Sequence, residues 1–140
     1  MQGEARQVSL RPMKKLLIVT AVIESGAGAA LLCCPSATVA ILLGAWQTGL
    51  ISSPTVTLGR VAGVALFALG VACWLARYDV QSCAARGLVG AMVLYNLGVA
   101  VVLGVVGIAS RPVGVALWPV IVLHAAMTAW CVTCLVSKRK

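Results

Sequence analysis

The chain has 140 residues, of which 61% are hydrophobic and only 10% charged, and its mean hydropathy is +1.05. A soluble domain is roughly 45–50% apolar and about 25% charged, so this composition excludes a water-soluble fold. The net charge of +8 comes from 11 Lys and Arg against 3 acidic residues. The basic residues gather at the termini and in one short connection, without a basic face or motif for nucleic acid. They are expected to act as topology signals near anionic lipid headgroups, and no nucleic-acid partner is predicted.

Four continuous apolar stretches are each long enough to cross a hydrocarbon core, which needs about 20 helical residues. They cover residues 16–34, 56–76, 88–109 and 113–136. A segment that spans a membrane must satisfy its own backbone hydrogen bonds, so each stretch is predicted to be an α-helix. Continuous runs also lack the alternation of β-barrel strands. We therefore predict an all-α fold, a single integral membrane domain over residues 1–140 built as a four-transmembrane-helix bundle.

The basic residues lie on alternate connections, which predicts the orientation of the bundle. Nine of the 11 precede the first helix, separate the second from the third, or end the chain: Arg6, Arg11, Lys14, Lys15, Arg77, Arg86, Lys138, Arg139 and Lys140. The turn between the third and fourth helices holds only Arg111. Residues 35–55 carry no charge. By the positive-inside rule, both termini are expected in the cytoplasm, with the protein in a bacterial inner membrane. Trp74 and Trp130 are expected near the inner boundary, and Trp46 and Trp118 near the outer one.

The outer connection, residues 35–55, is unusually apolar. Its run Val39–Trp46 is too short to cross the membrane and too apolar for a solvated loop. One interpretation is an interfacial or re-entrant segment, anchored by Trp46, that caps a cavity between the helices. The other is a packed surface loop, and the sequence does not separate the two.

Polar side chains at membrane depth are the candidates for function, because a charge there costs about 2.5–3.5 kcal/mol on insertion scales. They are Glu24, Arg60, Tyr95, Asn96 and His124. With a rise of 1.5 Å per residue, Glu24 and Asn96 lie roughly 12 Å, and His124 about 18 Å, from the cytoplasmic ends of their helices. These three are expected to converge near the midplane. Arg60 is shallower, and its long side chain can reach inward or snorkel outward.

This set predicts a ligand-binding or proton-relay site. Glu24 is expected to pair with Arg60 or His124, because an uncompensated buried charge is costly. Such a site could bind a quinone-like headgroup, relay a proton or coordinate a polar substrate. The alternative is that these groups only tie the bundle together through hydrogen bonds between helices. No catalytic residue is assigned.

The six cysteines are expected to be structural. Cys131 and Cys134 have the CxxC spacing of redox and metal sites, but they lie inside an apolar helix. Cys33 and Cys34 lie at the opposite end of the membrane, so the two pairs cannot share a metal or a disulfide. Free cysteine also behaves as a small hydrophobic residue, and no metal site is predicted. The single histidine argues against a haem held by two histidines of one chain.

Small residues are frequent within the helices, and Gly59 and Gly63 form a GxxxG pattern. This pattern lets two helix backbones approach closely. We favour the interpretation that these glycines pack against another helix of the same chain. A dimer interface is the alternative, and the sequence does not exclude it.

The segment Glu24-Ser25-Gly26-Ala27-Gly28-Ala29-Ala30-Leu31-Leu32 resembles the Glu-x-x-x-Gly-x-x-Leu-Leu pattern of DoxX-like small four-helix membrane proteins. The chain length and helix count are similar to that group as well, although here the glutamate lies on the first helix. Glu24 is the only residue of this sequence that the resemblance identifies as a site residue. Some DoxX-like proteins are associated with quinone-linked redox enzymes, so the resemblance implies a quinone-like ligand and an accessory role.

The predicted function is therefore a non-catalytic one. The protein is expected to bind a small lipophilic, quinone-like ligand or to serve as an accessory subunit of a membrane redox complex. One alternative is a proton-coupled small multidrug-type transporter, in which Glu24 exchanges protons for a cationic substrate within a dimer. Arg60 and the lack of an aromatic lining argue against it. Another is a purely structural subunit. Expected partners are the lipid bilayer and a homodimer or larger membrane complex.

Overall fold

The computed structural model describes residues 2–44, 51–110 and 113–137, with side chains from residue 12 onward. Five helices follow one another along the chain: α1 (Gln2–Cys33), α2 (Pro35–Leu43), α3 (Ser53–Ala76), α4 (Cys83–Ala109) and α5 (Leu117–Val136). Four of these described helices, all except α2, are long and apolar enough to cross a membrane. The predicted all-α, four-transmembrane-helix bundle is confirmed, and these helices fit a multi-pass membrane protein.

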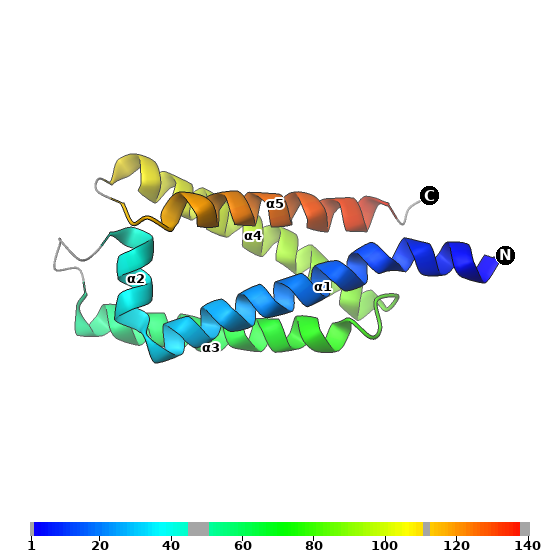
Figure 1. Ribbon diagram of the computed structural model, residues 1–140, viewed down its shortest axis with the longest axis horizontal. Coiled ribbons are helices and arrows are strands. Elements are labelled where there is room, and N and C mark those ends of the chain that lie inside the picture. Colours follow the sequence, from blue (N-terminus) through cyan, green and yellow to red (C-terminus); the bar gives the residue numbers. More distant parts are fainter. Residues whose placement is uncertain (1, 45–50, 111–112, 138–140) are drawn as a thin grey trace.

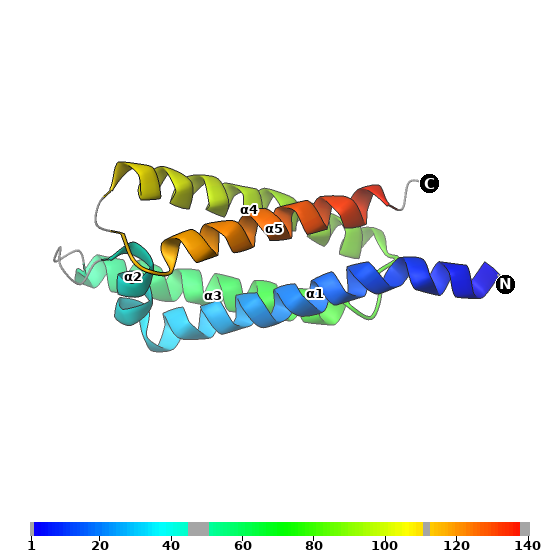
Figure 2. The ribbon, with the colours of Figure 1, turned by 45° about the horizontal axis from the view of Figure 1, so that its top comes forward.

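The four long helices run side by side along the molecule, and α2 lies across one end (Figures 1 and 2). Both termini lie at the other end (Figure 1). α1 packs closely against antiparallel α3, and α4 packs closely against antiparallel α5. Far fewer contacts join α3 to α4 or α1 to α5. The bundle is therefore two tightly packed helix pairs with looser packing between the pairs.

Two transmembrane helices begin a few residues earlier than the hydrophobic pattern predicts, because serines cap them. Ser52 Oγ accepts a hydrogen bond from the Thr55 amide at 3.4 Å at the start of α3. Ser82 Oγ accepts one from the Ala85 amide at 3.1 Å at the start of α4. An N-cap side chain satisfies an amide that has no partner within the helix. Polar capping residues thus extend the helices beyond the apolar run.

Ser82→Ala is expected to lower the free energy of unfolding by about 0.5–2 kcal/mol, the usual cost of losing an N-cap. The side chain also donates to the Asp79 carbonyl oxygen at 3.0 Å, so its loss frees two backbone groups. Unfolding in detergent with increasing dodecyl sulfate, followed by circular dichroism, measures the change. Ser137→Ala is the matched control, since the described hydrogen bond of Ser137 comes from its backbone amide. Equal losses in both variants would contradict the capping role.

The first and last long helices also differ from the predicted bounds. α1 begins at Gln2, and its membrane-spanning part is Pro12–Cys33. α5 begins at Leu117 rather than at residue 113. The residues just before it contact α2 instead, since the Ala116 amide donates to the Ile41 carbonyl oxygen at 3.2 Å.

The apolar outer segment forms the short helix α2. Pro35 stands in its first turn, and Gly44 ends it with a φ of 73°, in the left-handed region that glycine adopts without strain. Gly114 lies directly against the backbone of Ile41 and Leu42. α2 is therefore a packed helix that joins the end of α1 to the α4–α5 connection. The Trp46 anchor of the prediction lies outside the described residues.

The GxxxG glycines pack within the chain. A Cβ added to Gly63 would lie 2.9 Å from the Gly28 carbonyl oxygen, and one added to Gly59 would lie 3.3 Å from Pro35 Cβ. A Cβ added to Gly28 would lie 2.6 Å from the Phe67 amide nitrogen. Gly63 therefore serves the close approach of α1 to α3, and Gly59 that of α2 to α3; a homodimer stays a prediction.

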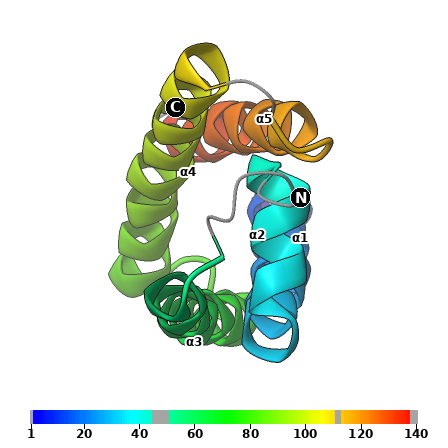
Figure 3. The same ribbon diagram turned by 90° about the vertical axis from the view of Figure 1, so that its left-hand side faces the viewer.

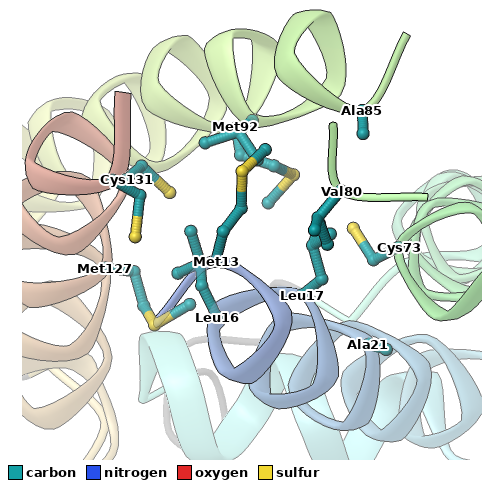
Figure 4. Packing of buried hydrophobic residues seen from close by; sticks show 12 residues of the cluster. Met13, Leu16, Leu17, Ala21, Cys73, Val80, Ala85, Met92, Met127 and Cys131 are labelled. Carbon is teal, nitrogen blue, oxygen red and sulfur yellow. The ribbon is translucent and has the colours of Figure 1, made fainter. Parts of the chain in front are cut away.

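The hydrophobic core lies in the half of the bundle nearer the termini. Met13, Leu16 and Leu17 of α1 lie between α4, α5 and the end of α3 (Figure 4). The same cluster contains Cys73, Cys131 and Cys134. No disulfide joins any of the six cysteines, all of which lie in the described ranges. These three cysteines pack in the core as small hydrophobic side chains.

Arg77, at the end of α3, is held by two aromatic side chains. Its guanidinium lies 3.3 Å from the ring centroid of Trp74 and 4.0 Å from that of Tyr78. It also donates to the Trp74 carbonyl oxygen and the Tyr78 hydroxyl. Cation–π contacts and these hydrogen bonds offset the burial of the charge, and this end of α3 has the arginine and aromatic residues typical of a membrane boundary.

Candidate functional site

Four of the five predicted site residues form one polar layer across the middle of the bundle. The Tyr95 hydroxyl of α4 donates to Glu24 Oε2 of α1 at 3.0 Å. His124 Nδ1 of α5 lies 2.7 Å from Asn96 Oδ1 of α4. The Tyr95 and His124 rings meet edge to face, with their centroids 5.7 Å apart. The layer therefore links three of the four transmembrane helices.

A hydrogen bond to the backbone orients Asn96, and a second satisfies a backbone carbonyl beside the layer. Asn96 Nδ2 donates to the Met92 carbonyl oxygen one turn earlier, at 2.8 Å. The Thr128 hydroxyl donates to the carbonyl oxygen of His124 at 2.8 Å. Asn96 is 1% exposed and Glu24 is 3% exposed. Buried polar groups of this kind need partners, and here the partners come from neighbouring helices and turns.

Arg60 is not brought to the polar layer. It is exposed on α3, and the described residues contain no ion pair between it and Glu24. Glu24 instead accepts its hydrogen bond from Tyr95, and His124 pairs with Asn96. Tyr95 and Asn96, which are adjacent on α4, thus supply the partners of Glu24 and His124. The depth of each residue along its helix does not predict this pairing.

A cavity of about 440 Å³ lies on the side of the polar layer that faces α2. Glu24, Tyr95 and His124 are the polar residues that line it at one end, and Thr38 of α2 is the polar residue at the other. All its other lining side chains are Ala, Val, Leu or Ile. Ligand sites typically have volumes of about 300–1,000 Å³, with a mostly apolar lining and a few polar groups. The cavity has the size and composition of such a site.

The position of the cavity follows from the packing of the bundle. The core cluster fills the half near the termini, so the polar layer forms one end of the cavity. Thr38, Val39 and Leu42 of α2 line the other end, where α2 lies alongside the end of α1 (Figure 3). The sparse contacts between the two helix pairs leave the space between them.

Two polar residues of this region are absent from the sequence-based prediction. Thr38 lines the cavity, and its hydroxyl donates to the Cys34 carbonyl oxygen at 2.9 Å. Thr20 is 1% exposed, and its hydroxyl has no hydrogen-bond partner among the described residues. Thr20 precedes Glu24 by four residues, so one face of α1 carries both. The spacing of four residues from Glu24 could have identified Thr20 from the sequence. The position of Thr38 in the cavity could not be predicted, because it depends on the fold of α2.

The site offers hydrogen bonding and proton exchange through a carboxyl, a phenol and an imidazole next to an apolar chamber. This arrangement suits recognition of an amphiphilic molecule with a small polar end. Compared with models of protein families, with curated proteins and with solved structures, the chain matches none of them.

Proposed function

We propose that this protein binds a small lipophilic ligand with a polar headgroup, of the quinone or quinol class, and that it acts as a binding or accessory subunit in a bacterial inner membrane. The observation that carries the proposal is the apolar cavity of about 440 Å³ with Glu24, Tyr95 and His124 at one end. An apolar tail would occupy the chamber while the headgroup meets the polar layer. The resemblance of α1 to DoxX-like proteins is consistent with this ligand class.

The charge distribution supports cytoplasmic termini. Lys14, Lys15, Arg77 and Arg86 belong to the end of the bundle where both termini lie (Figure 1). The positive-inside rule assigns such an end to the cytoplasm. In that orientation the cavity lies in the outer half of the membrane and α2 near the outer surface. A ligand would then reach the site from the outer leaflet.

The polar residues favour binding over a purely structural role. Groups that only tie helices together are expected to be packed on all sides, as Asn96 is. Glu24, Tyr95 and His124 instead line empty space. Polar groups next to a cavity are available to a ligand.

The test is native mass spectrometry of the detergent-purified protein, in wild type and in Glu24→Gln and His124→Ala variants. Wild type is expected to retain a quinone or lipid mass, or to take up added decylubiquinol. Both variants are expected to bind at least tenfold more weakly, a loss of about 1.4 kcal/mol. The loss is expected because Glu24→Gln replaces the carboxyl with an amide, and His124→Ala removes the imidazole.

Arg60→Gln is the matched control, since it changes a charged residue of a transmembrane helix outside the cavity lining. It is expected to bind as wild type does. Circular dichroism of every variant verifies that the helices are retained. Bare protein in all samples, with no uptake of decylubiquinol, would reject the proposal in favour of a structural subunit.

A further inference from the structure

The hydrogen bonds of the polar layer determine which nitrogen of His124 carries a proton. Asn96 Nδ2 donates to the Met92 carbonyl oxygen, which leaves Oδ1 as the atom that faces the imidazole. An amide oxygen only accepts hydrogen bonds. The contact of 2.7 Å between Asn96 Oδ1 and His124 Nδ1 therefore requires a proton on Nδ1.

The other nitrogen of the ring, Nε2, is then an acceptor. A charged side chain is costly at membrane depth, so the neutral ring is the relevant form, and it carries one proton only. No residue in the described part of the chain gives His124 Nε2 a hydrogen bond. His124 lines the cavity whereas Asn96, the partner of Nδ1, does not, so Nε2 is the ring nitrogen that remains available to a ligand in the cavity.

The other polar residues at this end of the cavity offer few hydrogen-bond donors to a ligand. The single hydroxyl hydrogen of Tyr95 is used in the bond to Glu24 Oε2, and the phenol oxygen keeps its lone pairs. The Thr38 hydroxyl donates to a backbone carbonyl. The cost of a charge at membrane depth applies to Glu24 as well, so its carboxyl is neutral and supplies one O–H donor. His124 and Tyr95 present acceptors in a chamber with few donors.

We propose that the cavity selects a lipophilic alcohol or phenol, including a reduced quinol, over the matching ether, ketone or quinone. The headgroup hydroxyl would donate to His124 Nε2, with the apolar tail toward α2. This inference rests on the proposed function and adds the class of headgroup. A ligand that can only accept leaves the imidazole acceptor unpaired, and sites built for a hydroxyl reject analogues that lack it. Asn96 serves as a positioning residue, because it determines the tautomer without lining the cavity.

The binding test compares 4-nonylphenol with 4-nonylanisole, which differ only in methylation of the hydroxyl. Isothermal titration calorimetry on the full chain in nanodiscs, with empty nanodiscs subtracted, gives both dissociation constants. The phenol is expected to bind at least tenfold more tightly. His124→Phe keeps an aromatic side chain and removes the acceptor, so the phenol is expected to lose its advantage while the anisole affinity changes little.

A spectroscopic test uses the fact that the chain contains 1 histidine. Protein labelled with ¹⁵N-histidine, and freed of any affinity tag, yields the two ring nitrogens of His124 alone. We expect a protonated Nδ1 and an unprotonated Nε2, with the Nε2 signal shifting on addition of 4-nonylphenol and not of 4-nonylanisole. Asn96→Leu is expected to mix the tautomers and to reduce the preference for the phenol.

The outcomes separate this inference from the proposed function. Equal affinities for phenol and anisole would overturn the headgroup selectivity and leave a lipophilic binding site in place. A proton on Nε2, or on both nitrogens, would also overturn it. If neither compound binds wild type, the headgroup inference and the proposed function both fail.

Discussion

Gly28→Ala is expected to destabilise the bundle by about 3 kcal/mol, the upper end of the usual cost of overpacking. The added Cβ would lie 2.6 Å from the Phe67 amide nitrogen and 2.7 Å from the Gly63 carbonyl oxygen. Both atoms belong to the backbone of α3, so neither can rotate away as a side chain would. The two helices would have to separate along their tightest contact. Equilibrium unfolding in detergent with dodecyl sulfate measures the free energy change.

Gly26→Ala is the control for that experiment. It lies on the same helix two residues earlier, and a Cβ added there would meet no atom of another element within 4 Å. Alanine also has the higher helix propensity, so Gly26→Ala is expected to be neutral or slightly stabilising. If Gly28→Ala is as stable as Gly26→Ala, the close packing of α1 on α3 is refuted.

Gly114→Ala is expected to displace α2 from the end of the cavity and to weaken ligand binding at least tenfold. The added Cβ would lie 2.6 Å from the carbonyl carbon of Ile41 and would also meet the backbone of Leu42. Those backbone atoms cannot give way locally, so α2 must move as a unit and lose the bond from the Ala116 amide to Ile41. Val39 and Leu42 would then no longer line the cavity. Calorimetry with 4-nonylphenol measures the affinity.

Hydrogen–deuterium exchange gives the second measurement on this variant. The amides of residues 35–43 are expected to exchange faster in Gly114→Ala, while those of α1 and α3 stay protected. Gly104→Ala on α4 is the control, because a Cβ there would meet no atom of another element within 4 Å. Unchanged exchange in α2 would show that the helix is held by other contacts. Faster exchange with unchanged affinity would show that α2 does not close the ligand site.

Much of the candidate site could be anticipated from residue type and depth. Glu24, Asn96 and His124 are polar residues within apolar stretches, and a constant rise per residue places them at similar depths in a bundle. The structure brings them together with Tyr95. Arg60 and the partners of Glu24 could not be anticipated in this way. Depth along an axis carries no information on the rotation of each helix about that axis.

The hydropathy pattern is sufficient to predict the four membrane-spanning helices, because a hydrocarbon core demands long apolar segments with internal hydrogen bonds. It also predicts the short apolar segment before α3, although not its helical form. The pairing of α1 with α3 and of α4 with α5, the place of α2 at one end, and the cavity between the pairs are visible only in the folded molecule. Helix association in a membrane depends on close packing of small residues and on individual hydrogen bonds. Contacts such as Gly28 on Phe67 and His124 on Asn96 depend on helix rotation and register, which a hydropathy pattern does not encode.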